Sequence, residues 1–329
     1  ITYNIHLYAT SGNIQKTDIN QLTEILKSTK TITSLQKTDK EKLENLITNG
    51  LSYRTTNEQL NIIFTFIKQY TLNNIQSKSI DYKIFSSLIE NLCRSSNEDI
   101  KKKIIEDILE PLFNTTLQDI IKTESAHNLL FELIGVLDKK STDKDIQDKI
   151  IKNILKPLFT VNLKEVKENK LDAQQIIKNV GFWNAVRNKY QVELSEYKLL
   201  KEFIKKVPSL QNYPQDLIIK NIIIPLFKTT LKDIKEGSVE YKLLISIITK
   251  LPSLEQSSQN QIMKDIISPI FEIPLKDIKY KSTQYKIIEF LLMISKNSSM
   301  IEINSGYVPK LYINAEHNNY DYTIIIQNN

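Results

Sequence analysis

The feature that most constrains this 329-residue chain is an internal repetition. A short motif, in which proline precedes an aliphatic residue and phenylalanine, occurs at Pro111-Leu112-Phe113, Pro157-Leu158-Phe159, Pro225-Leu226-Phe227 and Pro269-Ile270-Phe271. A leucine follows each copy, and an earlier degenerate copy adds one more: Leu72, Leu117, Leu163, Leu231 and Leu275, spaced 45, 46, 68 and 44 residues apart. Repetition at a nearly fixed period of this size is typical of a solenoid.

A second recurring pair of residues gives the same register. The pair is Tyr-Lys, and each copy opens a stretch with hydrophobic residues at helical spacing: Tyr82-Lys83, Tyr197-Lys198, Tyr241-Lys242 and Tyr285-Lys286, with His127-Asn128 in the remaining repeat. The spacings are 45, 70, 44 and 44 residues. Two independent columns with the same spacing indicate that the repeats are structural units.

Each repeat is predicted to be a pair of helices. After Tyr241, hydrophobic residues recur at helical spacing until Pro252-Ser253 ends the first helix. A second helix follows up to Pro269, where the missing N–H and the ring of proline should kink or end it. The Thr-Leu-x-Asp motifs at 116–119 and 230–233 match a capping box and predict a short third helix. Such a pair exposes hydrophobic side chains on both sides, so the repeats should stack.

The sequence therefore predicts an all-α chain, a right-handed α-solenoid of about five helix-pair repeats of 44–46 residues. Residues 71–297 form the predicted repeat domain, with an insertion at about 167–192. Residues 1–70 are predicted to hold an extended segment and atypical capping helices, and residues 298–329 an extended or β-like segment.

A repeat of about 45 residues with two main helices, a short third helix and a proline near a helix end resembles the HEAT and armadillo α-solenoids. The resemblance covers roughly residues 20 to 297. It implies a curved rod that offers an extended concave surface to a macromolecular partner. The abundance of Ile, Lys and Asn suits an AT-rich genome, and the chain is similar in character to exported helical-repeat proteins of AT-rich intracellular bacteria. An exported, surface or injected location is therefore expected over a cytoplasmic one, in a bacterium or parasite whose protein binds a host or partner protein.

Motifs of enzymes are missing from the sequence. It contains no Gly-rich phosphate loop, no nucleophile elbow and no metal-binding His-Glu-x-x-His, and it has only 6 glycines. Cys93 is the one cysteine, and the three histidines, His6, His127 and His317, lie in different regions. We therefore expect no enzymatic activity, no cofactor and no metal. Hydrophobic runs are short, so we also expect a soluble protein without membrane insertion.

The insertion supplies the candidate site for a partner. It contains the one tryptophan and one of three arginines of the chain, and Trp, Tyr and Arg are enriched in interaction hot spots. The candidate partner-binding residues are Phe182, Trp183, Arg187, Lys189 and Tyr190. The alternative is that Phe182, Val186 and Trp183 pack an added helix against its neighbours.

Charge gathers in the same part of the chain. The net charge is +6, yet residues 151–250 alone hold 18 Lys plus Arg against 10 Asp plus Glu. This asymmetry favours a protein partner with an acidic surface, and the alternative is a solvated lysine face. A further alternative is nucleic-acid binding by a lysine-rich concave surface of a HEAT-like solenoid.

The Tyr-Lys column is a second possible binding feature. Tyr82, Tyr197, Tyr241 and Tyr285 would form a ladder along one edge of the solenoid, suited to an extended peptide. The alternative is that these tyrosines pack within the repeats, because packing positions recur whereas binding positions are free to vary. The leading hypothesis is a non-enzymatic scaffold that binds another protein through its helical-repeat surface.

Overall fold

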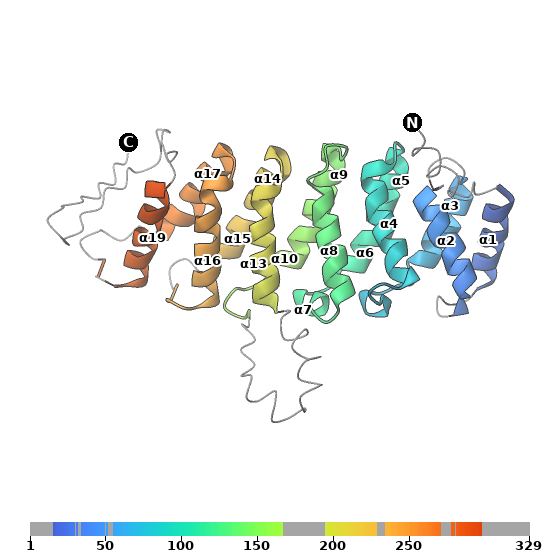
Figure 1. The fold of residues 1–329 in the computed structure, drawn as a ribbon, viewed down its shortest axis with the longest axis horizontal. Helices are drawn as coiled ribbons and strands as arrows, with labels where there is room; N and C mark the ends of the chain where they lie inside the picture. The colour runs from blue at the N-terminus through green and yellow to red at the C-terminus, as the bar shows by residue number, and fades with distance from the viewer. Residues whose placement is uncertain are drawn as a thin grey trace, which may run out of the picture. The chain divides into compact units, whose positions relative to one another are not determined.

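The computed structural model describes residues 16–29, 31, 34–49, 51, 55–166, 195–228, 234–270, 278–279 and 281–297. Within these ranges every regular element is helical and there is no strand (Figure 1). The prediction of an all-α chain is confirmed for this part of the molecule. The insertion at about 167–192, the segment 298–329 and the N-terminal extended segment lie outside the described residues.

The chain divides into two compact units, which are described separately. The first comprises residues 1–158 with 171–195, and the second residues 159–170 with 196–329.

The first unit contains two rows of helices. The front row in Figure 1 comprises α2 (Lys37–Asn49), α4 (Ile80–Arg94) and α8 (Glu124–Val136). The other row comprises α1 (Lys16–Ser28), α3 (Asn57–Ile67), the helix from α5 (Glu98–Lys103) to α6 (Glu110–Phe113), and the helix from α9 (Lys144–Lys149) to α10 (Lys156–Phe159). Helices contact their neighbours in the same row, α2 with α4 and α4 with α8, and α1 with α3.

The second unit is built in the same way. Its first helices are α13 (Glu196–Lys206), α16 (Val239–Lys250) and α19 (Thr283–Asn297), and α16 contacts both of the others. Its second helices run from α14 (Asn212–Ile218) to α15 (Ile224–Lys228) and from α17 (Gln256–Ile262) to α18 (Ser268–Ile270). Phe159, the last residue of α10, already belongs to the second unit, and its ring stacks on that of Phe203 with centroids 4.1 Å apart.

The first helices α4, α8, α13 and α16 bury the same five positions. They lie two, three, six, seven and ten residues after the position of Tyr82. In α4 these residues are Ile84, Phe85, Leu88, Ile89 and Leu92. The same register in α8 buries Leu129, Leu130, Leu133, Ile134 and Leu137. His127 therefore takes the place of the tyrosine, as predicted. The first helix α16 ends at Lys250, directly before the 3₁₀ turn Leu251–Ser253, which agrees with the predicted stop at Pro252.

The second helices continue for two residues past Pro111 and Pro157, to Phe113 and Phe159. Residues 271–277 lie outside the described part of the chain, so the predicted kink or end at Pro269 stays a prediction. A π-helical segment precedes each proline: Ile104–Leu109, Ile150–Leu155, Ile219–Ile223 and Met263–Ile267. In each case the residue just before the proline donates its N–H to the carbonyl five residues back, as Ser268 does to Met263.

The spacing of the hydrophobic residues explains the π-helical segments. Buried pairs recur every four residues, as in Ile104-Ile105, Ile108-Leu109 and Leu112-Phe113. An α-helix turns by about 100° per residue, so pairs four residues apart would drift around it by about 40° each time. A π-helical turn, with i→i+5 hydrogen bonds, widens the helix and keeps the pairs on one face.

The short third helix is present where the capping box is described. In α7 (Leu117–Ile120) the Thr116 hydroxyl accepts the Asp119 N–H while the Asp119 side chain accepts the Thr116 N–H. The second predicted capping box, at 230–233, lies outside the described residues.

A tight turn with a left-handed residue precedes three of the first helices. Lys78, Gly237 and Lys281 have φ values of 65°, 77° and 62°, and each is followed by the serine that caps the helix. The turns are alike, since Ser79 N–H bonds Gln76 O at 3.1 Å and Ser238 N–H bonds Lys235 O at 3.0 Å. A lysine in this conformation is strained, whereas glycine is not.

Exchanging the residue types at this turn should change stability in opposite directions. Lys78→Gly should stabilise the protein by about 0.5 kcal/mol because it relieves backbone strain. Gly237→Ala should destabilise it by about 1 kcal/mol through φ alone, since a Cβ there meets nothing within 4 Å. Urea unfolding of both variants measures the changes. Equal signs would contradict the account.

A column of polar side chains lies inside the second helices. The side chains stand ten residues before each proline: Lys101, Gln147, Gln215 and Gln259, of which the first three are buried. Two of them reach the N-terminus of the second helix in the next repeat. Lys101 Nζ lies 3.3 Å from Asp143 Oδ2, and Gln215 Oε1 accepts the Glu255 N–H at 2.8 Å. Asp143 and Glu255 are the N-cap residues of α9 and α17. The column therefore aligns successive repeats.

Two substitutions of Lys101 test whether the polarity of this side chain or its size stabilises the protein. Lys101→Met should destabilise the protein by about 1–3 kcal/mol, because it removes the ammonium that pairs with Glu98 and Asp143. Lys101→Gln should cost less, about 1 kcal/mol or below, because glutamine serves at this position in other repeats. Chemical denaturation provides the measurement. A glutamine variant as unstable as the methionine variant would refute the shared role of the column.

Candidate interaction surface

The four tyrosines of the predicted ladder lie in the first turn of a first helix. Tyr82 is on α4 in the first unit, and Tyr197, Tyr241 and Tyr285 are on α13, α16 and α19 in the second. A serine N-cap positions three of them by accepting the tyrosine N–H: Ser79, Ser238 and Ser282, at 3.0, 3.2 and 3.2 Å. The local sequence Ser-x-x-Tyr thus places the tyrosine in the first turn of the helix, three residues after the N-cap.

Tyr82 is bound to the neighbouring repeat. Its hydroxyl donates a hydrogen bond of 2.6 Å to Glu132 Oε1 on α8. Partial burial, and then this bond to the carboxylate, raise the pKa of Tyr82. The phenol therefore joins α4 to α8.

The tyrosines of the second unit meet lysines. Tyr197 is buried, with 8 % of its surface exposed, and the Nζ atoms of Lys201 and Lys242 lie 5.6 Å and 5.9 Å from its ring centroid. Lys242 belongs to the next repeat. Burial, with Glu236 nearby, raises the pKa of Tyr241, and Lys286 of the following repeat opposes that rise. Lys286 also forms an ion pair with Glu236.

These contacts favour the packing alternative for the tyrosine column. Tyr82 and Tyr197 are engaged with the next repeat, and little of the Tyr197 ring faces solvent. The ladder as a binding site stays a prediction. The other predicted partner-binding residues, Phe182, Trp183, Arg187, Lys189 and Tyr190, lie outside the described residues.

Around the tyrosines, the exposed faces of the first helices differ from repeat to repeat. The position of Lys201 is held in other repeats by Ser86, Phe131, Ile245 and Glu289, and that of Lys205 by Glu90, Gly135 and Thr249. On α13 both positions are lysines and follow Lys198 on the same face. Sequence reasoning found the local excess of positive charge but missed this face. This face can be identified from the sequence by aligning the repeats and comparing the exposed positions with the buried ones.

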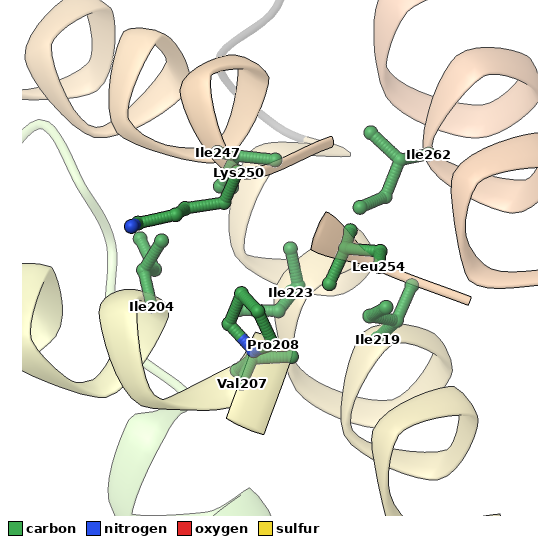
Figure 2. Close-up of a pocket in the computed structure, with 9 residues that line it drawn as sticks. All are labelled: Ile204, Val207, Pro208, Ile219, Ile223, Ile247, Lys250, Leu254 and Ile262. Carbon is green, nitrogen blue, oxygen red and sulfur yellow. The ribbon is translucent and has the colours of Figure 1, made fainter. Parts of the chain in front are cut away.

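A small pocket lies within the second unit. Apolar side chains of both helix rows line it, together with Lys250, as Figure 2 shows: Ile204, Val207, Pro208, Ile219, Ile223, Ile247, Leu254 and Ile262. Its volume is about 10 Å³, which is room for about one water molecule. The pocket is a gap between packed repeats and is too small for an organic ligand.

Other chemistry-bearing residues have local partners. His127 lies over Phe131 with ring centroids 4.8 Å apart, and the half-buried Cys93 Sγ is 3.4 Å from Thr142 Oγ1. Among the described residues no group of three or more His, Cys, Asp or Glu side chains could hold a metal ion. In the same part of the chain, no helix has both the length and the hydrophobicity to cross a membrane.

Comparisons with protein-family models, with curated proteins and with solved structures find no match to this chain.

Replacing Tyr82 by phenylalanine should test whether the column is structural. Tyr82→Phe should destabilise the protein by about 1–2 kcal/mol, because Glu132 loses a hydrogen bond in a half-buried site. Tyr197→Phe is the matched control, expected to change stability by less than about 0.5 kcal/mol, since its described contacts involve the ring. Thermal and urea unfolding measure both. No loss in Tyr82→Phe would argue against a packing role.

Proposed function

We propose that this chain is a non-enzymatic scaffold that binds another protein through a helical-repeat surface. In this proposal the helix pairs form a HEAT-like α-solenoid of about five repeats, and the partner presents an acidic surface. The support comes from the matched contacts of successive repeats: first helices contact first helices, as α13 does α16, and second helices contact second helices, as α14 does α17.

One observation carries the proposal. Buried positions are the same in the first helices α4, α8, α13 and α16, whereas the solvent-facing positions vary and carry lysines on α13. Packing dictates the constant positions and leaves the variable ones free. Variation confined to an exposed face is what a scaffold with a distinct recognition surface requires. Enzymatic activity would instead require catalytic groups held together, and no feature of the described surface favours it.

The insertion offers the sharpest test of binding. The double variant Trp183→Ala with Arg187→Ala should recover at least about tenfold less of a specific partner in affinity capture, because aromatic and arginine side chains carry most interface energy. The captured protein is identified by mass spectrometry after nuclease treatment. Thermal unfolding should match that of the parent chain.

Arg94→Ala is the matched control, since Arg94 is an exposed arginine on α4, paired with Glu90. It should capture the partner normally. If the double variant has the same unfolding temperature as the parent chain and binds the partner equally well, the insertion is not the binding site. Recovery that is lost on nuclease treatment and restored by added nucleic acid would favour the nucleic-acid alternative.

A further inference from the structure

We propose that the exposed face of α13 is a docking site for an acidic segment of a partner protein, bound by Lys198, Lys201 and Lys205. This inference rests on the proposed function and names the surface and the partner chemistry that the function leaves open.

The three lysines form a row on one side of the helix. They stand at positions i, i+3 and i+7, which lie on one face of an α-helix, and the row is about 10 Å long at 1.5 Å per residue. Lys198 and Lys205 are exposed, and Lys201 is half-buried, with its Nζ over the Tyr197 ring at 5.6 Å from the centroid. The buried ring and the hydrophobic side of α13 hold the row in place.

Within the described residues, no carboxylate lies within ion-pair distance of Lys201 or Lys205. Some lysines of each unit do have such a partner, as Lys286 has Glu236 in the second unit and Lys149 has Glu106 in the first. Like charges three or four residues apart on a helix destabilise it by a few tenths of a kcal/mol per pair. Repulsion between Lys201 and Lys205, four residues apart, is therefore a cost that an acidic ligand would remove.

Repeat comparison shows that folding does not require the row. At the positions of Lys201 and Lys205 the other repeats carry neutral or acidic residues, among them Ser86, Ile245 and Glu90. The first helices of those repeats fold around the same buried pattern. The fold of a first helix therefore does not require a lysine at the position of Lys201 or of Lys205.

The surroundings favour a protein segment over a nucleic acid. Single strands of nucleic acid bind by stacking bases on exposed aromatic rings, and the ring beside the row, Tyr197, is only 8 % exposed. The described part of α13 and α16 carries no arginine for paired hydrogen bonds to bases or phosphates. Lysine ammonium groups at helical spacing fit carboxylates at matching spacing. The expected ligand is a helical segment antiparallel to α13, with glutamates at i, i+4 and i+7, which is the lysine spacing read in reverse.

Peptide binding to the full chain tests this inference. The probe is a fluorescent helical peptide of about 18 residues with glutamates at that spacing, compared with the same peptide carrying glutamines. Anisotropy at about 50 mM salt should show binding of the glutamate peptide, weakened at about 300 mM, and little binding of the glutamine peptide. Lys201→Glu with Lys205→Glu should weaken binding by about tenfold or more.

The matched control changes the net charge equally at another place in the second unit. Lys220 and Lys264 are exposed and each is the one lysine of its π-helical segment. Lys220→Glu with Lys264→Glu should weaken binding by no more than about twofold. A milder pair, Lys201→Gln with Lys205→Gln, keeps the test valid if the glutamate variant fails to fold.

Several outcomes would overturn the inference. These are no binding of the glutamate peptide at low salt, equal losses in the site and control variants, and tighter binding of a single-stranded oligonucleotide than of the peptide. If Trp183→Ala with Arg187→Ala abolishes partner capture while the α13 variants capture normally, the scaffold function stands and the α13 site is refuted.

Discussion

The burial of paired aliphatic residues along the second helices is the interaction on which the structure depends. The pairs recur every four residues, and a regular α-helix cannot keep them on one face. The π-helical segments before Pro111, Pro157, Pro225 and Pro269 meet that requirement, and they also accommodate a residue that has no N–H. One local change of helix geometry thus satisfies both the hydrophobic pattern and the proline.

Polar contacts give this hydrophobic stack its register. Lys101 and Gln215 join the inside of one second helix to the N-terminus of the next, and Tyr82 joins two first helices through Glu132. Two apolar helix faces can pack in registers that differ by one helical turn. A buried hydrogen-bond donor allows only the register in which it meets its acceptor. The alignment of successive repeats is therefore set by a few side chains whose identities differ from repeat to repeat.

Much of the fold could be predicted from spacing, because hydrophobic periodicity reflects burial directly. Residue spacing predicted the helix pairs, the equivalence of His127 with the tyrosines, and the capping box at Thr116. The π-helical segments before the prolines were not predicted, because the rule for proline assumes α-helical hydrogen bonds. The lysine row on α13 was missed for another reason. A charge count over a hundred residues does not resolve which residues share an exposed face, and the residues of the insertion lie outside the described structure.

The turn that precedes the first helices has a consequence for how the chain folds. Several contacts between neighbouring helix pairs within each unit join residues 39 to 50 positions apart: Gln59 with Asn20, Tyr82 with Glu132, and Lys286 with Glu236. Loops of this size close at little entropic cost, so folding rates should be those of a protein with local contacts. The three similar turns at Lys78, Gly237 and Lys281 have one backbone conformation in common, and each connects one helix pair to the next.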